Sequence, residues 1–311
     1  DRWQPWICCH NQDGWFAVPQ KNPKALRRIP CDPDAESVCH RGSGVFEVRH
    51  QGAFFIADLE KRMIVVPPTD RSELWFYNCF EERMPLRSGD KWGVVDRDGN
   101  WVLRPKYSFV GRSAMGRQDA MQGELFGYLD REGRVVIDFQ FTYVTPFRQG
   151  LAFVAKKFGK VNRFFFIRED GSAAFSGTFT GGSAFSEGRA AVRYGRSEPF
   201  GYIDLEGKQV IPPQFKAGSR FSEGLAGVVR GRPYDELDGV PEYVDRNGQT
   251  VLRFDAFPGA RPGCFAGALA LIDTGMKMIY INRSGEVVWM REDRWPTANP
   301  GYLYPRDMEI E

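Results

Sequence analysis

The chain has 311 residues, of which 42% are apolar and 14% aromatic, so it is long and apolar enough to bury a sizeable core. Its 42 basic and 40 acidic side chains leave a formal charge of +2, which excludes a protein whose whole surface is built to bind nucleic acid. No stretch is apolar over the roughly 18–20 residues that a membrane-spanning helix needs, so no span is expected. The 34 glycines and 20 prolines favour many short strands joined by turns.

Residues 1–90 are the least regular part of the chain. They carry aromatic side chains such as Trp3, Trp6 and Trp15, and only faint copies of the unit that recurs further along, as in Gly52–Asp58. The end of a repeat array must be capped, because a terminal unit would otherwise expose an apolar face. We therefore interpret residues 1–90 as degenerate repeats that form an N-terminal cap.

Most cysteines and all histidines lie early in the chain. A zinc site would use Cys8, His10, Cys31 and Cys39, but these ligands are not spaced as the usual pairs two to four residues apart. A disulfide between Cys31 and Cys39 is a second interpretation, which export of the protein would favour. Buried free thiols are the simplest one. We expect no metal and no cofactor, and the sequence leaves open the disulfide state of the six cysteines, which are Cys8, Cys9, Cys31, Cys39, Cys79 and Cys264.

From residue 91 to residue 289 a unit of three short apolar runs recurs. In one copy, Phe200–Ile203 is a strand-like run, a turn ends at Gly207, and Val210-Ile211 starts a second run that Pro212-Pro213 stops. Residues 225–229 form the third run. The turn glycine recurs at intervals of 34 to 41 residues, which indicates an array of supersecondary units. These glycines are Gly99, Gly133, Gly171, Gly207, Gly248 and Gly285.

Two further signatures mark each unit. The first run starts with an aromatic residue, which we place at Trp92-Gly93, Phe126-Gly127, Phe165-Phe166, Phe200-Gly201 and Tyr243. A Phe-x-x-Gly-x-Ala pattern precedes the third run. We expect its phenylalanines, Phe147, Phe185 and Phe221, to lie in the core, and its glycines, Gly150, Gly188 and Gly224, to take positive φ.

These residues resemble the WG-repeat family of bacterial proteins, named for the pair that stands here at Trp92-Gly93. We expect an all-β fold of tandem, antiparallel three-stranded meanders in a curved open array, with a closed propeller-like ring as the alternative. The domains are then 1–90 (degenerate repeats or cap), 91–289 (WG-type β-repeats) and 290–311 (tail or cap, with Trp295, Tyr302 and Tyr304). The resemblance implies a binding or scaffold role rather than a reaction.

The recurring Asp-x-x-Gly turns invite a calcium or catalytic interpretation. However, Arg97, Arg131 and Arg246 occupy the second position of three of them, and no glutamate follows at the spacing of a calcium loop. Aspartate before glycine is explained by hydrogen bonding within the turn. An enzyme needs one asymmetric group of residues, whereas these recur in every unit, and no phosphate-binding or His-Glu-x-x-His motif is present. We therefore predict that the protein is not an enzyme, with a hydrolase on a propeller-like fold as an alternative.

The segments that join the third run of one unit to the first run of the next are basic in several copies. If the units stack in register, these segments form a positive stripe; the other interpretation is a solvated edge that prevents unwanted strand pairing. The predicted stripe comprises Lys156, Lys157, Lys160, Arg163, Arg193, Arg196, Arg230 and Arg232, with Arg49, His50, Arg87 and Lys91 in upstream copies.

We predict a non-enzymatic repeat scaffold that binds another macromolecule, most simply a protein with an acidic surface, as an inhibitor, an immunity protein or an envelope binding protein. The alternative is a module for carbohydrate or peptidoglycan, including anionic glycans, that uses exposed aromatics such as Trp101, Tyr107, Tyr143 and Tyr194. Residue 1 is an aspartate, so removal of a secretory segment is one interpretation and a trimmed sequence the other. The first favours a periplasmic or secreted location.

Overall fold

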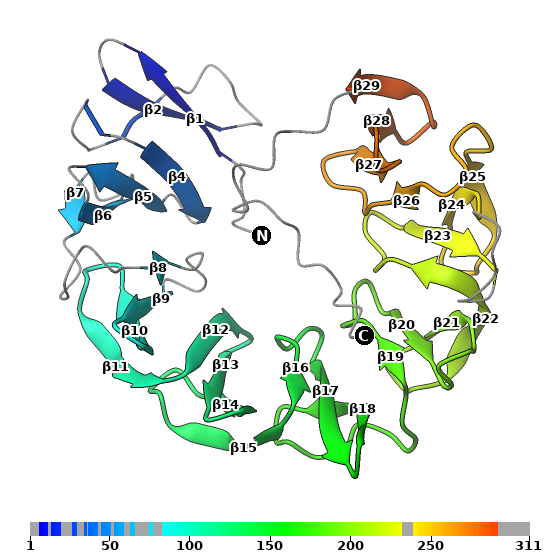
Figure 1. The fold of residues 1–311 in the computed structure, drawn as a ribbon, viewed down its shortest axis with the longest axis horizontal. Coiled ribbons are helices and arrows are strands. Elements are labelled where there is room, and N and C mark those ends of the chain that lie inside the picture. The colour runs from blue at the N-terminus through cyan, green and yellow to red at the C-terminus, as the bar shows by residue number, and fades with distance from the viewer. Residues whose placement is uncertain are drawn as a thin grey trace. The chain divides into compact units, whose positions relative to one another are not determined.

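The structure is a computed structural model. It describes residues 6–11, 14–19, 27–29, 34–35, 37–42, 45–50, 53–58, 63–65, 75–76, 83–231 and 239–291. Throughout this part of the chain the regular elements are β-strands, which pair in antiparallel fashion (Figure 1). The described residues contain no helix with the length and apolar character of a membrane span. The predicted all-β fold class is confirmed.

The chain divides into two compact units, Asp1–Pro146 and Phe147–Glu311. Unit 1 contains the sheets β1-β2-β3, β4-β5-β6-β7, β8-β9-β10-β11 and β12-β13-β14-β15. Its strands are β1 (Trp6–Asn11), β2 (Gly14–Pro19), β3 (Arg27–Arg28), β4 (Ser37–Gly42), β5 (Val45–His50), β6 (Ala53–Asp58), β7 (Met63–Val65), β8 (Trp75–Phe76), β9 (Arg83–Ser88), β10 (Lys91–Asp96), β11 (Trp101–Tyr107), β12 (Phe109–Ala114), β13 (Arg117–Gln122), β14 (Leu125–Leu129), β15 (Val135–Phe141) and β16 (Tyr143–Val144).

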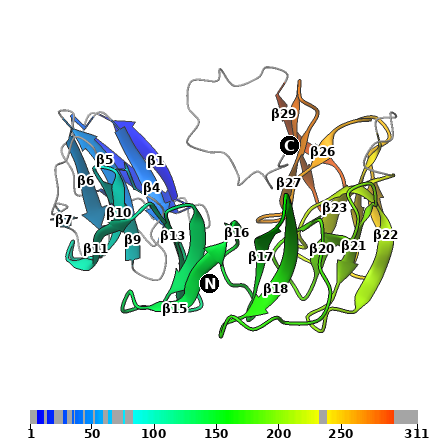
Figure 2. The ribbon, with the colours of Figure 1, turned by 60° about the horizontal axis from the view of Figure 1, so that its bottom comes forward.

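Unit 2 contains the β17–β18 hairpin, a seven-stranded sheet from β19 to β25 in chain order, and a four-stranded sheet, β26-β27-β28-β29. Its strands are β17 (Leu151–Phe158), β18 (Val161–Arg168), β19 (Gly181–Gly182), β20 (Ala190–Arg193), β21 (Phe200–Ile203), β22 (Gln209–Gly218), β23 (Ala226–Arg230), β24 (Pro241–Val244), β25 (Thr250–Arg253), β26 (Arg261–Pro262), β27 (Leu269–Asp273), β28 (Met278–Asn282) and β29 (Val287–Arg291). Both views show β20 to β23 side by side (Figures 1 and 2).

Each repeat is a meander in which two hairpins share a central strand. In the copy β20-β21-β22, Val192 pairs with Gly201, and Tyr202 pairs with Ile211. The next copy, β23-β24-β25, repeats this order. The predicted tandem meanders are therefore confirmed. The prediction that Pro212-Pro213 stop the second run is wrong, because β22 continues through both prolines to Gly218, and its pairing with β21 is irregular there. The choice between an open array and a ring stays a prediction, and so do the domain boundaries at residues 90 and 289.

The Asp-x-x-Gly turns form by local hydrogen bonding, as predicted. Asp204 Oδ1 accepts a hydrogen bond from Lys208 N at 2.8 Å, and Gly207 N donates to Asp204 O at 3.0 Å. Gly207 has a φ of +81°, a conformation that L residues other than glycine rarely adopt. The aspartates at positions 96, 130 and 245 hold their turns in the same way. Their carboxylates are thus occupied by their own backbone.

The Phe-x-x-Gly segments form tight turns in which two consecutive residues have positive φ, as in a type I′ turn. In one such turn Glu187 has a φ of 52° and Gly188 of 76°, and in the next Glu223 has 54° and Gly224 has 83°. The prediction of positive φ at these glycines, and at Gly150 with 82°, is confirmed. The turn orients the phenylalanine before it toward the core.

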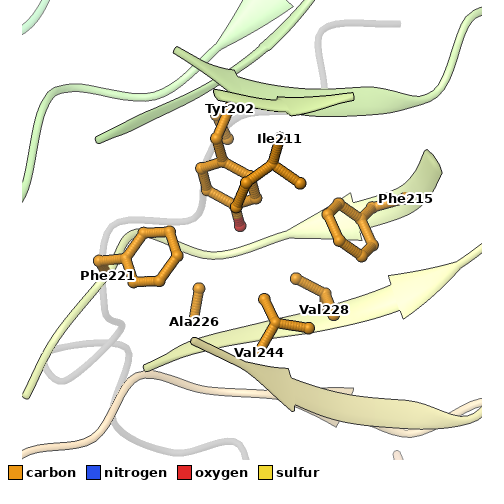
Figure 3. Close-up of a cluster of buried hydrophobic side chains, with 8 residues drawn as sticks. Tyr202, Ile211, Phe215, Phe221, Ala226, Val228 and Val244 are labelled. Atoms are coloured by element: carbon orange, nitrogen blue, oxygen red, sulfur yellow. The ribbon is translucent and has the colours of Figure 1, made fainter. Parts of the chain in front are cut away.

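The core of unit 2 is built from the inward residues of consecutive repeats. Tyr202, Ile211, Phe215 and Phe221 are fully buried and pack with Ala226, Val228 and Val244 of the following repeat (Figure 3). The predicted burial of the signature phenylalanines is confirmed, since Phe147 and Phe185 are 1% exposed and Phe221 is 0% exposed. Each repeat thus completes its core only with its neighbour.

The glycine of the aromatic–glycine pair is required by a close backbone approach. A Cβ on Gly201 would lie 2.6 Å from Ile211 O, and one on Gly127 would lie 2.5 Å from Ile137 O. In both repeats the central strand pairs irregularly at this point with the third strand of the meander (β15 or β22, which corresponds to the second run of the sequence unit), as a β-bulge would make it. The bulge brings the carbonyl against the glycine.

Two of the predicted aromatic starts were assigned to the wrong position. Val244 pairs with Ala226 as Ile203 pairs with Ala190, so Tyr243 takes the place of Tyr202 and not of Phe200. By the same register Phe166 takes that place, because Ile167 pairs with Ala152. The error arose because the central strand can carry aromatic residues at two positions that are two residues apart. In one copy the first of these positions is occupied by Pro241.

Candidate binding surface

The β17–β18 hairpin carries basic and apolar side chains at its end. Its strand pairing places Phe158 opposite Val161 and Lys156 opposite Arg163. Paired residues of antiparallel strands project from the same face, and every second residue shares that face. These four side chains therefore lie on one face of the hairpin end. Phe158 is 52% exposed and Val161 is 43% exposed.

Further cations lie at the same hairpin end, with Lys157 on the opposite face from the apolar pair. Lys157 and Lys160 are exposed, and neither forms an ion pair with any acidic group in the described part of the chain. Arg163 is also exposed and donates from Nη1 to Thr178 Oγ1 at 3.3 Å. With Lys156, four cations fall within eight residues, so the hairpin end has a positive potential.

The neighbouring β20–β21 hairpin end is connected to this one through residues 178–180. Arg163 contacts Thr178, and Thr180 N donates to Arg193 O at 2.9 Å. The Arg193 side chain reaches along its own loop, where Nη1 donates to Arg196 O at 3.5 Å. The predicted stripe residues of these two repeats are therefore brought together.

Tyr194 adds a third exposed apolar group to this region. It is 43% exposed, and its ring centre lies 5.3 Å from that of the buried Phe179. Phe179 is bridged in turn to Phe164 on β18 by backbone hydrogen bonds. We call the combined surface the tip patch. It comprises Lys156, Lys157, Phe158, Lys160, Val161, Arg163, Arg193, Tyr194 and Arg196.

Arg230, which was predicted to continue the stripe, is partly exposed and is held by three side chains of its own sheet. Its Nε donates to Glu242 Oε2 at 2.9 Å, its Nη2 donates to Thr250 Oγ1 at 3.0 Å, and its Nη1 bonds to Gln214. Its guanidinium also lies 5.3 Å from the ring centre of Phe215. The side chain of Glu242 is only 2% exposed, so Arg230 serves to compensate a buried carboxylate.

The remaining stripe residues do not extend the tip patch. Arg232 and the side chain of His50 lie outside the described residues, and Arg49 is exposed on β5 of unit 1. Arg87 donates to Gly89 O at 2.9 Å, and Lys91 lies 3.6 Å from Asp90. The stripe as a binding site stays a prediction. Its described residues lie most densely at the tip patch.

Most of the aromatics considered for glycan binding belong to the interior. Tyr107 is 3% exposed, and Trp101 packs against the cluster of Val45, Met84 and their neighbours. Tyr143 is only partly exposed. Of the four, Tyr194 alone is exposed.

The predicted cysteine chemistry falls largely outside the described residues. The side chains of Cys8, Cys9 and Cys39 are not described, and neither are Cys31 and Cys79. Cys264 is a free thiol whose Sγ lies 3.5 Å from Arg220 O. Among the described residues no group of three or more His, Cys, Asp or Glu side chains is placed to hold a metal ion.

Sequence reasoning missed a ladder of contacts that joins consecutive type I′ turns. Gly188 N donates to Gln149 Oε1 at 2.9 Å, and Gly224 N donates to Glu187 Oε2 at 2.9 Å. In the next step Ala268 N donates to Glu223 at 3.1 Å. The signal was a glutamate or glutamine before the turn glycine in three copies, at the position that reaches the following repeat.

Arginines from an Asp-x-x-Gly turn and from the equivalent Asn-x-x-Gly turn complete this ladder. Arg246 lies 2.8 Å from Glu187, and Arg283 lies 3.6 Å from Glu223. Partial burial disfavours the charged form of Glu187, but the Arg246 contact and the backbone donors together outweigh it and lower the pKa of Glu187. The acidic groups at this end of the strands are therefore used for joining repeats.

A buried acid in unit 1 also escaped sequence reasoning. Asp119 on β13 is 8% exposed, and its Oδ1 accepts a hydrogen bond from Arg112 N at 3.1 Å. Burial raises its pKa to about 6, although the hydrogen bond and the Arg112 charge oppose the rise. Burial, and secondarily the nearby Asp119 charge, raises the pKa of Tyr128. Asp119 pairs with Tyr128 on the central strand β14, and at the position equivalent to Asp119 the neighbouring repeats have apolar residues.

The family described as WG containing repeat matches residues 92–113, 126–157 and 200–231. These matches begin at Trp92-Gly93, Phe126-Gly127 and Phe200-Gly201, the pairs whose glycine faces the third strand. At these three places the chain matches the WG repeat. The resemblance predicted from the sequence is confirmed at these three places. A comparison with curated proteins gives no match.

Solved structures similar to this chain share little sequence with it. A structure described as the eukaryotic initiation factor matches with a TM-score of 0.60 and 11% identity, over 93% of this chain and 85% of that one. BamB from Moraxella catarrhalis gives 0.46 and 10%, over 93% and 88%. AztD from Citrobacter koseri gives 0.42 and 12%, over 94% and 95%. At such identities the first likeness shows the fold alone.

Proposed function

We propose that this WG-repeat chain is a non-enzymatic scaffold that binds a protein with an acidic surface through the tip patch. The observation that carries the proposal is the exposure of Phe158 and Val161 beside four cations on one hairpin end. Apolar groups ringed by charge are typical of protein interfaces, in which an apolar centre contributes affinity and the charges contribute orientation and association rate.

A solvated, edge-protecting role explains the cations less completely. Lysines on a strand edge discourage unwanted pairing, and they do so without an aromatic neighbour. Here Phe158 keeps 52% of its surface in water although the same unit buries Phe153 and Phe166 almost fully. An exposed aromatic of that kind is costly to solubility and is a typical interface anchor.

A scaffold role also agrees with how the other polar residues are used. The turn carboxylates bond their own backbone, and Glu187 and Glu223 join consecutive repeats. Each of these groups recurs once per repeat and serves the fold. We therefore propose that the repeats supply a broad binding surface and do not catalyse a reaction.

Charge reversal tests this proposal. In the double variant Lys157→Glu and Lys160→Glu, binding to the protein partner captured from the source organism is expected to fall by at least about tenfold and to lose its salt dependence. Polyglutamate serves as a defined acidic probe in the same titration. The matched control, Lys208→Glu with Arg220→Glu, changes the net charge equally at exposed sites elsewhere. Equal affinities of both variants and wild type would rule out the tip patch.

An anionic glycan is the second candidate because Tyr194 lies exposed beside Arg193 and Arg196. An aromatic face next to cations suits a sulfated or carboxylated sugar. Heparin is the defined probe, and Tyr194→Ala should weaken its binding while leaving polyglutamate binding unchanged. Binding of heparin without any protein partner would favour the glycan over the protein.

A further inference from the structure

Arg193 on β20 occupies a position of the repeat that is apolar and buried in the two adjacent copies. It stands three residues after the first alanine of its strand, and by the same strand register this position holds Ala155 on β17 and Val229 on β23. Ala155 is 0% exposed and Val229 is 8% exposed. Removing a charge from water at such a position is costly unless the charge is compensated. The partners of the Arg193 guanidinium therefore need to be identified.

The guanidinium of Arg193 is held over an aromatic ring but has few hydrogen-bond partners. Its Cζ lies 5.1 Å from the ring centre of Phe200. Its Nη1 donates to Arg196 O at 3.5 Å, which is a long hydrogen bond. Its Nε is buried and bonds no described group, whereas its Nη2 bonds no described group and is not buried. The end of the guanidinium formed by Nη1 and Nη2 is therefore open to a ligand.

No acidic side chain in the described part of the chain neutralises Arg193. Glu198, which lies in the same loop, forms no ion pair with it. Arg230 in the next repeat is the contrast, because it also lies over a phenylalanine ring but pairs with Glu242 at 2.9 Å. The position of Glu242 is taken by Gly201 in the repeat of Arg193. Among the described residues, the acceptor that Arg230 has is thus missing beside Arg193.

Gly181 on β19 leaves the space that the Arg193 side chain fills. Gly181 pairs with Arg193, and its φ lies outside the left-handed region that favours glycine. A Cβ on Gly181 would lie 3.0 Å from Arg193 Nε and 3.6 Å from Arg193 Cγ, and its three nearest atoms all belong to this side chain. Packing of Arg193 therefore accounts for the glycine, and the guanidinium is held between Gly181 and the ring of Phe200.

We propose that Arg193 is the carboxylate-binding residue of the tip patch, whose Nη1 and Nη2 donate to an aspartate or glutamate side chain of the protein partner. This inference rests on the proposed function, in which the tip patch binds an acidic protein. The planar fork of arginine matches the two oxygens of a carboxylate, and a ring beneath the fork fixes its plane. The lysines of the tip patch attract the acidic surface from a distance, whereas Arg193 selects one carboxylate in a set orientation.

Arg193→Lys tests this role in the full chain, because lysine keeps the charge but lacks the planar fork. The affinity for polyglutamate, measured by calorimetric titration at fixed ionic strength, is expected to fall by about tenfold or more. The matched control is Arg196→Lys, which changes an exposed arginine of the same loop. It should leave the affinity within about twofold, because an exposed charge in water contributes little. Circular dichroism melting curves establish that both variants remain folded.

Nuclear magnetic resonance of the wild-type chain gives a second readout, which does not depend on how a variant folds. The Nε–H signal of Arg193, assigned through its bonds to the backbone, should shift when polyglutamate binds. An unchanged signal would refute the proposal. So would a signal that already shows a hydrogen-bonded guanidinium in the free chain, which would mean that the chain itself supplies the acceptor. A shift with heparin but not with polyglutamate would refute the carboxylate of a protein in favour of a glycan.

The result for Arg193 is separable from the result for the tip patch as a whole. If Lys157→Glu with Lys160→Glu weakens binding while Arg193→Lys and Arg196→Lys have equal, small effects, the tip patch stands and the role of Arg193 is refuted. If the charge reversal leaves binding unchanged, the proposed function fails and this inference fails with it. Weakening by the charge reversal and by Arg193→Lys, but not by Arg196→Lys, supports both.

Discussion

Replacing Gly201 by alanine is expected to destabilise unit 2 more than replacing a turn glycine. The added Cβ would lie 2.6 Å from Ile211 O, 2.9 Å from Pro213 N and 3.1 Å from the carbonyl carbon of Pro212. All three are backbone atoms of the bulged third strand, so no side-chain rotation relieves the overlap. Overpacking of this kind costs about 2–3 kcal/mol in the free energy of unfolding.

Gly188→Ala is the matched control. Gly188 has a φ of +76°, and nothing lies within 4 Å of an added Cβ, so this change introduces backbone strain without overlap. An L residue in this conformation costs about 1 kcal/mol. The following repeat tolerates a side chain at the Gly201 position, namely Glu242, whose pairing with β25 is regular at that residue.

The assay is urea denaturation of wild type and both variants, with hydrogen exchange of the β21 and β22 amides reporting on unit 2. Separate reporting is needed because a chain of two units need not unfold in one step. Equal losses of unfolding free energy in Gly201→Ala and Gly188→Ala would refute the close-approach argument. Wild-type stability of Gly201→Ala would refute it as well.

Three further changes test individual contacts. The pKa of Asp119 is about 6 in the folded chain, against an ordinary value of 3.8. Folding therefore takes up a proton between these pH values, and stability falls as the pH rises through them. Asp119→Asn should stabilise unit 1 at pH 7 by up to about 3 kcal/mol and flatten this pH dependence in thermal melts. Tyr202→Phe removes a buried hydroxyl that donates to Ser219 O at 2.7 Å, so we expect a loss of about 1–2 kcal/mol in urea denaturation, and an unchanged midpoint would contradict this. Glu187→Ala removes the acceptor of Gly224 N and should cost about 1–2 kcal/mol, whereas Glu187→Gln, which keeps an acceptor, should lose less than half of that; equal losses would show that the charge and not the hydrogen bond matters.

Local chemistry explains which parts of the fold were predictable. Gly207 and Gly224 are recognisable because positive φ is costly for other residues, whatever the rest of the molecule does. Phe221 is recognisable as core because its turn recurs with the same spacing. The alternation of Phe200 and Tyr202 was harder, because strand register and not residue type decides which aromatic is inside.

The candidate site was predictable only in part. The basic composition of the hairpin ends is visible in the residues, but composition does not distinguish Lys157 from Arg230. Arg230 is held by an ion pair with Glu242, a buried residue that replaces the usual glycine and needs its charge compensated. The exposure of Phe158 was not anticipated either, since phenylalanine in a strand is normally buried.

Turn geometry and the period of the repeat are short-range properties, so the order of residues alone sets them through φ preferences and spacing. Contacts between repeats are different, because their energies depend on which strands lie side by side and in what register. The hydrogen bond from Gly224 to Glu187 and the ion pair of Arg230 with Glu242 both arise at that level. The folded arrangement therefore decides which charges and apolar groups remain available to a partner.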